Sequence, residues 1–229
     1  VYEESSINIF ISLMIGIFLV GCCSWVFTRK DGSDLSLSDG FIITVLFWLV
    51  LSLFGALPFY FLGFSFVDSL FESMSGITTT GATVFSGLDE LDKSVLIYRQ
   101  LLQWMGGMGL IVLAIAVMPL LGIGGGQLFK TQTPGAMSNQ KLTPRITNTA
   151  RALWLIYLGL TILCLSSYKL AGMSFFDSFA HALSTVSIGG FSTHDASIGF
   201  FNNINIEIVC MVFMILSAIN FSLHYGLIY

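Results

Sequence analysis

Long apolar stretches alternate with short polar connections along this chain. Five of the stretches contain about 20 apolar residues or come close to that length, and they carry almost no charge: 7–27, 41–62, 101–121, 152–168 and 208–229. A helix needs about 20 such residues to cross the hydrocarbon core of a bilayer, which is about 30 Å thick. The pattern therefore predicts an all-α membrane protein.

Two shorter apolar stretches lie between the long ones. Residues 66–80 follow the second long stretch, and residues 175–187 follow the fourth. Each is too short to cross a membrane as a helix, and each begins next to an acidic residue. Short apolar segments of this kind are typical of re-entrant helices, which enter the membrane and return to the same side.

These two short stretches belong to an internal repeat. Residues 63–75 and 172–184 align without a gap, with Gly, Ser, Phe, Asp and two further Ser residues in common. Asp68 and Asp177 stand 177 − 68 = 109 residues apart, and the same register places Gly81 on Gly190. The repeated unit is helix, re-entrant helix, loop, helix, as in potassium channels. We expect the two loops to enter from the same side and to lie at the same depth.

The basic residues predict an orientation and a division of the chain. Six of them, in the first connection and in the segment after the third long stretch, fall on one side of the membrane, and three fall on the other side. The positive-inside rule makes the six-residue side cytoplasmic, with both re-entrant helices entering from outside. The predicted parts are a preceding transmembrane helix with its cytoplasmic connection, a first repeat, a cytoplasmic linker and a second repeat: 1–39, 40–121, 122–150 and 151–229.

The loops after the re-entrant helices are the candidate ion-binding site. Non-helical backbone at membrane depth is tolerated only where it is buried in protein or lines a watery path. There it can present carbonyl oxygens to a cation, and the negative end of the preceding helix favours the same charge. Ordinary turns are the alternative, but they do not explain the repeated half-length helices. The candidate filter residues are Thr78, Thr79, Thr80, Gly81, Ala82, Ser187, Ile188, Gly189, Gly190 and Phe191.

Three acidic residues on the re-entrant helices are candidates for shaping the potential at the pore mouth. Asp68 and Asp177 open the two helices, where an acid is favoured by the helix dipole by about 0.3–1 kcal/mol and can act as a cap. Glu72 lies one turn further in, where a charge is costly and usually functional. It either adds negative potential to the outer mouth or pairs with a neighbour such as Arg99. We expect Gly106, Gly107 and Gly109 to allow close helix contact away from the ion path.

Composition excludes several other classes of function. Only 10% of the residues are charged, against about 25% in soluble domains, and no basic patch points to nucleic acid. The four cysteines lie inside apolar runs, and His181 and His194 match no metal-ligand spacing. No catalytic motif of a hydrolase is present, so we expect no enzyme activity, no covalently bound cofactor and no metal other than K⁺ at the filter.

Four segments resemble the TrkH-type subunits of the Trk/Ktr/HKT superfamily of potassium transporters. They are the first loop with its helix, a glycine-containing stretch of the third long run, a basic linker segment and the second loop: 71–83, 99–109, 141–145 and 188–195. The resemblance covers nearly the whole chain. It implies potassium translocation across the bacterial cytoplasmic (inner) membrane, with sodium-coupled or sodium-conducting transport as the alternative. Glycine at both filter positions resembles the potassium-selective pattern.

The resemblance also implies an assembly larger than this chain. Members of the superfamily carry four such repeats around one pore, form homodimers and sit on a cytosolic nucleotide-binding subunit of the TrkA type. The segment 130–151 is then the expected contact with that subunit, which is the only implied source of a nucleotide. The chain does not begin with Met, and its last apolar run stops at Tyr229 without a polar flank, so we expect a truncated sequence. Gating residues of later repeats have no counterpart here.

Overall fold

The computed structural model of the chain describes residues 4–28, 37–117 and 142–219. Every regular element in these ranges is helical, so the all-α expectation is confirmed. The elements are α1 (Glu4–Thr28), α2 (Leu37–Phe61), α3 (Phe66–Ile77), η1 (Leu88–Glu90), α4 (Lys93–Val117), α6 (Leu142–Ala171), α7 (Phe175–Val186), η2 (Ser197–Phe201) and α8 (Ile204–Ala218).

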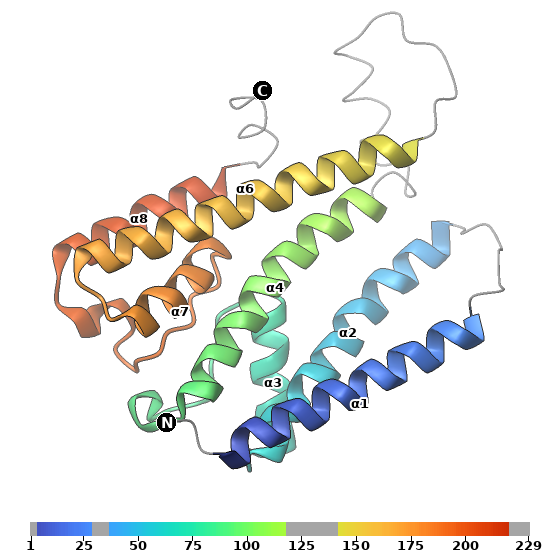
Figure 1. Ribbon diagram of the computed structural model, residues 1–229, viewed down its shortest axis with the longest axis horizontal. Coiled ribbons are helices and arrows are strands. Elements are labelled where there is room, and N and C mark those ends of the chain that lie inside the picture. The colour runs from blue at the N-terminus through green and yellow to red at the C-terminus, as the bar shows by residue number, and fades with distance from the viewer. Residues whose placement is uncertain (1–3, 29–36, 118–141, 220–229) are drawn as a thin grey trace, which may run out of the picture.

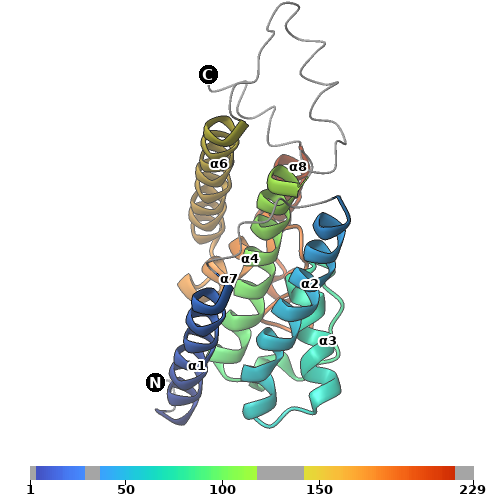
Figure 2. The ribbon, with the colours of Figure 1, turned by 90° about the vertical axis from the view of Figure 1, so that its right-hand side faces the viewer.

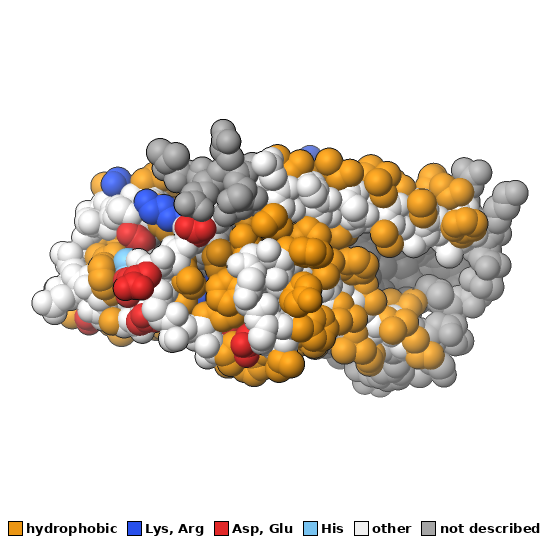
Figure 3. All heavy atoms as spheres, turned by 90° about the horizontal axis from the view of Figure 1, so that it is seen from below, with side chains coloured by type: hydrophobic (Ala, Val, Ile, Leu, Met, Phe, Trp, Pro, Cys, Tyr) orange, Lys and Arg blue, Asp and Glu red, His pale blue; other side chains and the backbone are white. Residues whose placement is uncertain are grey.

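Three of the described helices are long and apolar enough to cross a membrane: α1, α2 and α6 over Asn8–Thr28, Ile42–Phe61 and Arg151–Ala171. α4 has 25 residues, and α8 has 15 described residues. The remainder of the fifth apolar run lies outside the described residues. Many large apolar side chains on α1, α2 and α6 are exposed, as lipid-facing surfaces require. Figure 3 shows hydrophobic side chains over much of one face and acidic ones gathered near α7 and η1.

The repeat predicted from the sequence is present in the fold. α2, α3 and α4 form the first unit, and α6, α7 and α8 form the second (Figure 1). α3 and α7 have 12 residues each, and each follows a glycine with positive φ, Gly63 at 103° and Gly172 at 110°. Glycine suits this tight entry because a side chain disfavours positive φ. The helices end at Ile77 and Val186, slightly before the ends of the apolar stretches.

α4 joins the two units because it packs against both short helices (Figures 1 and 2). Each unit has its own hydrophobic core: Leu102 of α4 belongs to the first and Met108 to the second. Two α4 glycines permit these contacts. A Cβ on Gly106 would lie 1.9 Å from the Ile77 carbonyl oxygen, and one on Gly107 would lie 2.9 Å from the Tyr157 hydroxyl. The expected close contact is confirmed, and at Gly106 it is made with Ile77, the residue that directly precedes the first loop.

The helix α6 begins ten residues before the apolar run that predicted it, at Leu142. An apolar run indicates only the part of a helix that meets lipid, and backbone hydrogen bonds can extend it further. Pro144 fits this start, since the first turn of a helix has no use for the missing N–H. Lys130 and Lys141 of the predicted linker, and Arg29 and Lys30 of the first connection, lie outside the described residues.

Candidate functional site

The two short helices begin with the same hydrogen-bonded motif. The hydroxyl of Ser65 accepts from the Asp68 backbone N–H at 3.1 Å and donates to the Asp68 carboxylate at 2.7 Å. Ser174 makes the same pair of bonds with Asp177, at 3.1 and 2.6 Å. The capping side chains are therefore the serines, whereas the sequence pointed to the acids. Both acids still lie in the first turn, where they favour the helix dipole.

The backbone turns away from each short helix in the same way. We call residues 78–82 the first loop and residues 187–191 the second loop. The N–H groups that start each loop bond to carbonyls of the last helical turn, at 2.9 Å in the first loop and at 2.9–3.3 Å in the second. Thr79 and Ile188 have φ of 55° and 56°, and Gly81 and Gly190 have φ of 77° and 86°. A positive φ at equivalent positions shows that the repeat extends to backbone conformation.

The loop carbonyls are the groups left available to a ligand. The N–H groups of residues 78–81 and 187–189 donate to the last turns of the short helices, whereas the carbonyl oxygens of residues 78–81 and 187–190 accept no hydrogen bond from any described residue. The Phe191 side chain cannot line an ion path, because it is only 3% exposed and packs against the Arg99 guanidinium, 4.4 Å from its ring centre. From this residue only the backbone is available.

The two loops meet directly. A Cβ on Gly81 would lie 1.9 Å from the carbonyl oxygen of Gly189 and 3.6 Å from the Cα of Gly190. Glycine suits this approach, since any side chain would collide with the backbone of the second loop. Gly81 and Gly190 therefore lie side by side although they are far apart in the sequence, which agrees with the expectation that the two loops lie at the same depth.

Glu72 and Arg99 form an ion pair behind the loops. Arg99 Nε lies 2.6 Å from Glu72 Oε1, and both side chains are fully buried. Thr83 donates to the same carboxylate at 2.8 Å and accepts from Arg99 at 3.0 Å. Arg99 also donates to the carbonyl of Ser192, just beyond the second loop, at 3.0 Å. Pairing with Arg99 was one of the two alternatives for Glu72, and it is present. The ion pair connects the segment that follows the first loop to the segment that follows the second loop.

A neutral pair replaces this charge pair in the second repeat. His181 stands where Glu72 stands in the first repeat, and Ser192 stands where Thr83 stands. His181 Nδ1 lies 2.9 Å from the Asp177 carbonyl, and Nε2 lies 2.9 Å from the Ser192 hydroxyl. A carbonyl can only accept, so Nδ1 carries a proton and donates to it, and in the neutral ring Nε2 then accepts from Ser192. Glu72 and His181 therefore play the same part in the two repeats, because each contacts the residue that follows its own loop. The first contact involves an ion pair and the second only neutral hydrogen bonds.

Asp177 lies in a cluster that joins the outer parts of the two repeats, whereas Asp68 does not. His194 bridges two acids: its Nδ1 donates to Asp89 of η1, and its Nε2 lies 3.4 Å from Asp177. Thr193 also donates to Asp177, at 2.9 Å. The hydrogen bond from His194 lowers the pKa of Asp89 below its ordinary value. The described side-chain partner of Asp68 is Ser65 alone.

Comparison with known proteins agrees with this architecture. Residues 5–229 match the TrkH family, described as "Cation transport protein". The chain belongs to the TrkH family. It is 49% identical over 228 residues to the Trk system potassium uptake protein TrkH of Vibrio parahaemolyticus, covering 98% of this chain and 47% of the relative. It is 48% identical over 227 residues to the Trk system potassium uptake protein TrkG of Escherichia coli K12, covering 98% and 47%.

A solved structure agrees as well. The crystal structure of the potassium transporter TrkH from Vibrio parahaemolyticus matches with a TM-score of 0.84 and 47% identity, over 98% of this chain and 45% of that one. The resemblance drawn from the sequence motifs is therefore confirmed. The chain spans about half the length of the TrkH-family relatives that it matches.

Sequence analysis of this TrkH-family chain missed several residues of the site. Gln103 of α4 bonds to both ends of the second loop, and Thr83 and Ser192 connect the two repeats through Arg99. One signal was available, since polar side chains at membrane depth are expensive and usually have a partner or a function. Arg99 and Gln103, one turn apart in a helix that is long and largely apolar, carry that signal.

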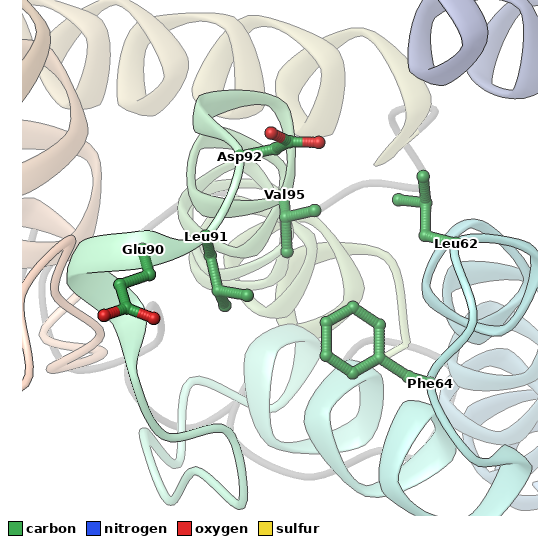
Figure 4. A pocket seen from close by; sticks show the side chains of 6 residues that line it. All are labelled: Leu62, Phe64, Glu90, Leu91, Asp92 and Val95. Carbon is green, nitrogen blue, oxygen red and sulfur yellow. The ribbon is translucent and has the colours of Figure 1, made fainter. Parts of the chain in front are cut away.

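A cleft of about 260 Å³ lies on the outer part of the first repeat, apart from the loops. Figure 4 shows Phe64 and Leu62 on one side and the start of α4 with η1 on the other, with the carboxylates of Glu90 and Asp92 around it. None of the candidate filter residues lines this cleft. The cleft is therefore separate from the candidate site that the first and second loops form.

Proposed function

We propose that this chain forms part of the wall of a potassium path in a K⁺ uptake protein of the bacterial cytoplasmic membrane. The observation that carries the proposal is the pair of adjoining loops with free carbonyls and matched positive φ angles. A dehydrating K⁺ ion needs several oxygen ligands at once, and backbone carbonyls at the end of re-entrant helices supply them. The relatives named Trk system potassium uptake proteins support the same ion.

Ion flux from liposomes tests this function directly. The full-length protein that contains this chain is reconstituted, and K⁺ flux is measured alone and in competition with Na⁺. We expect K⁺ flux that Na⁺ competes with weakly. Equal fluxes of the two ions, or K⁺ flux that requires Na⁺, would favour the sodium-conducting or sodium-coupled alternative. Protein that is well folded but carries neither ion would contradict the proposal.

The conducting unit contains more than this chain. Two loops supply half of the ring of four that the family resemblance implies, and the chain spans about half the length of its relatives. Carbonyls of a half ring would face lipid, where each unpaired group costs several kcal/mol. The isolated chain is therefore expected not to conduct as a monomer. Flux from the isolated chain would require a dimer with a complete ring, and a crosslink between two copies next to Gly81 would reveal it.

The proposed partners are a second copy of the full-length protein and a cytosolic nucleotide-binding subunit. The basic segment 130–151 is the proposed contact with that subunit, because a soluble partner can reach only residues outside the membrane. Neutralising Lys141 and Arg145 together should weaken retention of the subunit in a pull-down from detergent. The matched control neutralises Lys169, which the charge distribution places on the other side. Unchanged retention in the double variant would place the contact elsewhere.

A further inference from the structure

Gln103 of α4 ties together the two ends of the second loop. Its side chain is closed off from solvent, and its Oε1 accepts two hydrogen bonds. One comes from the hydroxyl of Ser184 in the last turn of α7, at 2.8 Å, and the other comes from the backbone N–H of Phe191, at 3.1 Å. Ser184 precedes the loop and Phe191 ends it. A single oxygen from the first repeat therefore fixes the span of a loop in the second repeat.

The amide also supports the middle of the loop. The N–H of Phe191 can only donate, so the atom facing it must be the amide oxygen, and this determines how the side chain is turned. A Cβ on Gly189 would lie 2.3 Å from Gln103 Cδ, 2.4 Å from Oε1 and 2.7 Å from Nε2. The amide thus packs against Gly189, whose carbonyl in turn lies against Gly81 of the first loop. Movement of the amide would be transmitted to the place where the loops meet.

The described part of the first repeat has no such support. Ser75 is the equivalent of Ser184, and its hydroxyl has no hydrogen-bond partner among the described residues. Ala82 is the equivalent of Phe191 and is exposed. The outer helix of the second repeat, α8, carries only apolar residues and Cys210 between Glu207 and Ser217. Within the described part of this chain, α4 therefore has a polar side chain that supports a loop, whereas α8, the equivalent helix of the second repeat, does not.

We propose that Gln103 is a positioning residue that sets the carbonyl geometry of the second loop, and with it the preference for K⁺ over Na⁺. This inference rests on the proposed function, because it concerns the selectivity of the same path. Loss of the acceptor leaves the Phe191 N–H unpaired in a buried site, so the loop shifts to find another partner. Selectivity between K⁺ and Na⁺ depends on how carbonyls are placed and held, so a shifted loop discriminates less.

Three α4 variants of the full-length protein test this role in liposomes, with the K⁺-to-Na⁺ permeability ratio as readout. Gln103→Leu removes the acceptor at similar volume and should lower the ratio by about tenfold. Gln103→Glu keeps an acceptor oxygen at the same reach, and burial without a counter-ion keeps the acid protonated and neutral, so this variant should retain most of the parental ratio. Gln100→Leu is the matched control, since Gln100 is equally buried on the same helix and its side-chain amide has no hydrogen bond to described residues. It should leave the ratio unchanged.

The outcomes are separable. A fall in Gln103→Leu alone supports the positioning role. Parental ratios in both Gln103 variants overturn it, and so do equal losses in all three variants or equal losses in the two Gln103 variants. If Gln103→Leu does not reach the membrane, Ser184→Ala removes one of the two bonds from the other side and should lower the ratio less than tenfold; an unchanged ratio there overturns the role. Absence of K⁺ flux in the parental protein contradicts the proposed function itself, before any variant is compared.

Discussion

The carboxylate of Glu72 and the guanidinium of Arg99 lie 2.6 Å apart with no access to solvent, between the short helix of the first repeat and the helix that joins the two repeats. Both charges also contact Thr83, and Arg99 reaches the backbone of Ser192. A buried charge keeps its place only when its partner and its hydrogen bonds are present. The ion pair is therefore expected to hold Thr83, which follows the first loop, at a fixed distance from Ser192, which follows the second loop.

Glu72→Gln should destabilise the full-length protein strongly. The variant keeps the shape of the side chain but leaves the Arg99 charge buried without a counter-ion, which costs about 3–5 kcal/mol. The midpoint of heat-induced aggregation in detergent, followed by gel filtration, should fall well below that of the parent. Asp68→Asn on the same helix is the control, because Asp68 is exposed, and should change the midpoint little.

A double variant separates the ion pair from other roles of Glu72. Adding Arg99→Gln to Glu72→Gln removes the orphaned charge, so the combined loss should be smaller than the sum of the two single losses. Additive losses would contradict the coupling. Unchanged stability with altered conductance in Glu72→Gln would instead favour the role of Glu72 as a source of negative potential at the outer mouth.

Local features of this fold could be predicted from the sequence because they depend on residues close together in the chain. The half-length helices are of this kind, and so is the sequence pattern that aligns Gly81 with Gly190. The Glu72–Arg99 pair was one of two predicted alternatives, because a lone charge at membrane depth is costly. The bonds from Gln103 to Phe191 and from His194 to Asp89 join residues 88 and 105 positions apart. No periodicity encodes such pairs, since they follow from how whole helices pack.

Asp89→Asn should lower stability at neutral pH but not in strong acid. The hydrogen bond from His194 depresses the pKa of Asp89 in the folded state, so the stabilisation is present above the ordinary Asp pKa of about 3.9 and is lost as pH falls through the lower folded value. The difference in thermal midpoint between parent and variant should narrow as the pH is lowered below about 4. Glu90→Gln, on the same exposed segment but outside the contact with His194, is the matched control for loss of an acidic side chain. A constant difference at all pH values would contradict the ionised contact.

The orientation can be tested by labelling from each side of the membrane. Single cysteines replace Glu90 and Ser138 in a background without the native cysteines at 22, 23, 164 and 210. Glu90 is exposed near the outer cluster, and using it leaves the contact between His194 and Asp89 intact. A membrane-impermeant maleimide added to intact cells should label the cysteine at 90, and the cysteine at 138 should react only after the cells are opened. Labelling of both from outside would overturn the predicted orientation.

The last prediction concerns the two loop glycines, which should differ in their tolerance of a methyl group. Gly81→Ala brings the new Cβ within 1.9 Å of the Gly189 carbonyl oxygen, at a φ of 77°. Gly190→Ala meets no described heavy atom within 4 Å, although its φ is 86°. Left-handed backbone costs a non-glycine residue about 1–2 kcal/mol, so strain alone acts at Gly190, whereas strain and collision act together at Gly81.

We therefore expect the K⁺-to-Na⁺ permeability ratio to fall modestly in Gly190→Ala and further in Gly81→Ala, measured as reversal potentials of the reconstituted full-length protein. Gly106 is unsuitable as a control because it lies against Ile77. Gly159 of α6 is better, since a Cβ there meets no described atom within 4 Å and its φ is ordinary. Gly159→Ala should keep the parental ratio. If Gly81→Ala also kept it, the collision with Gly189 would have been absorbed without moving any ion ligand, and residues 78–82 would not form a wall of the path.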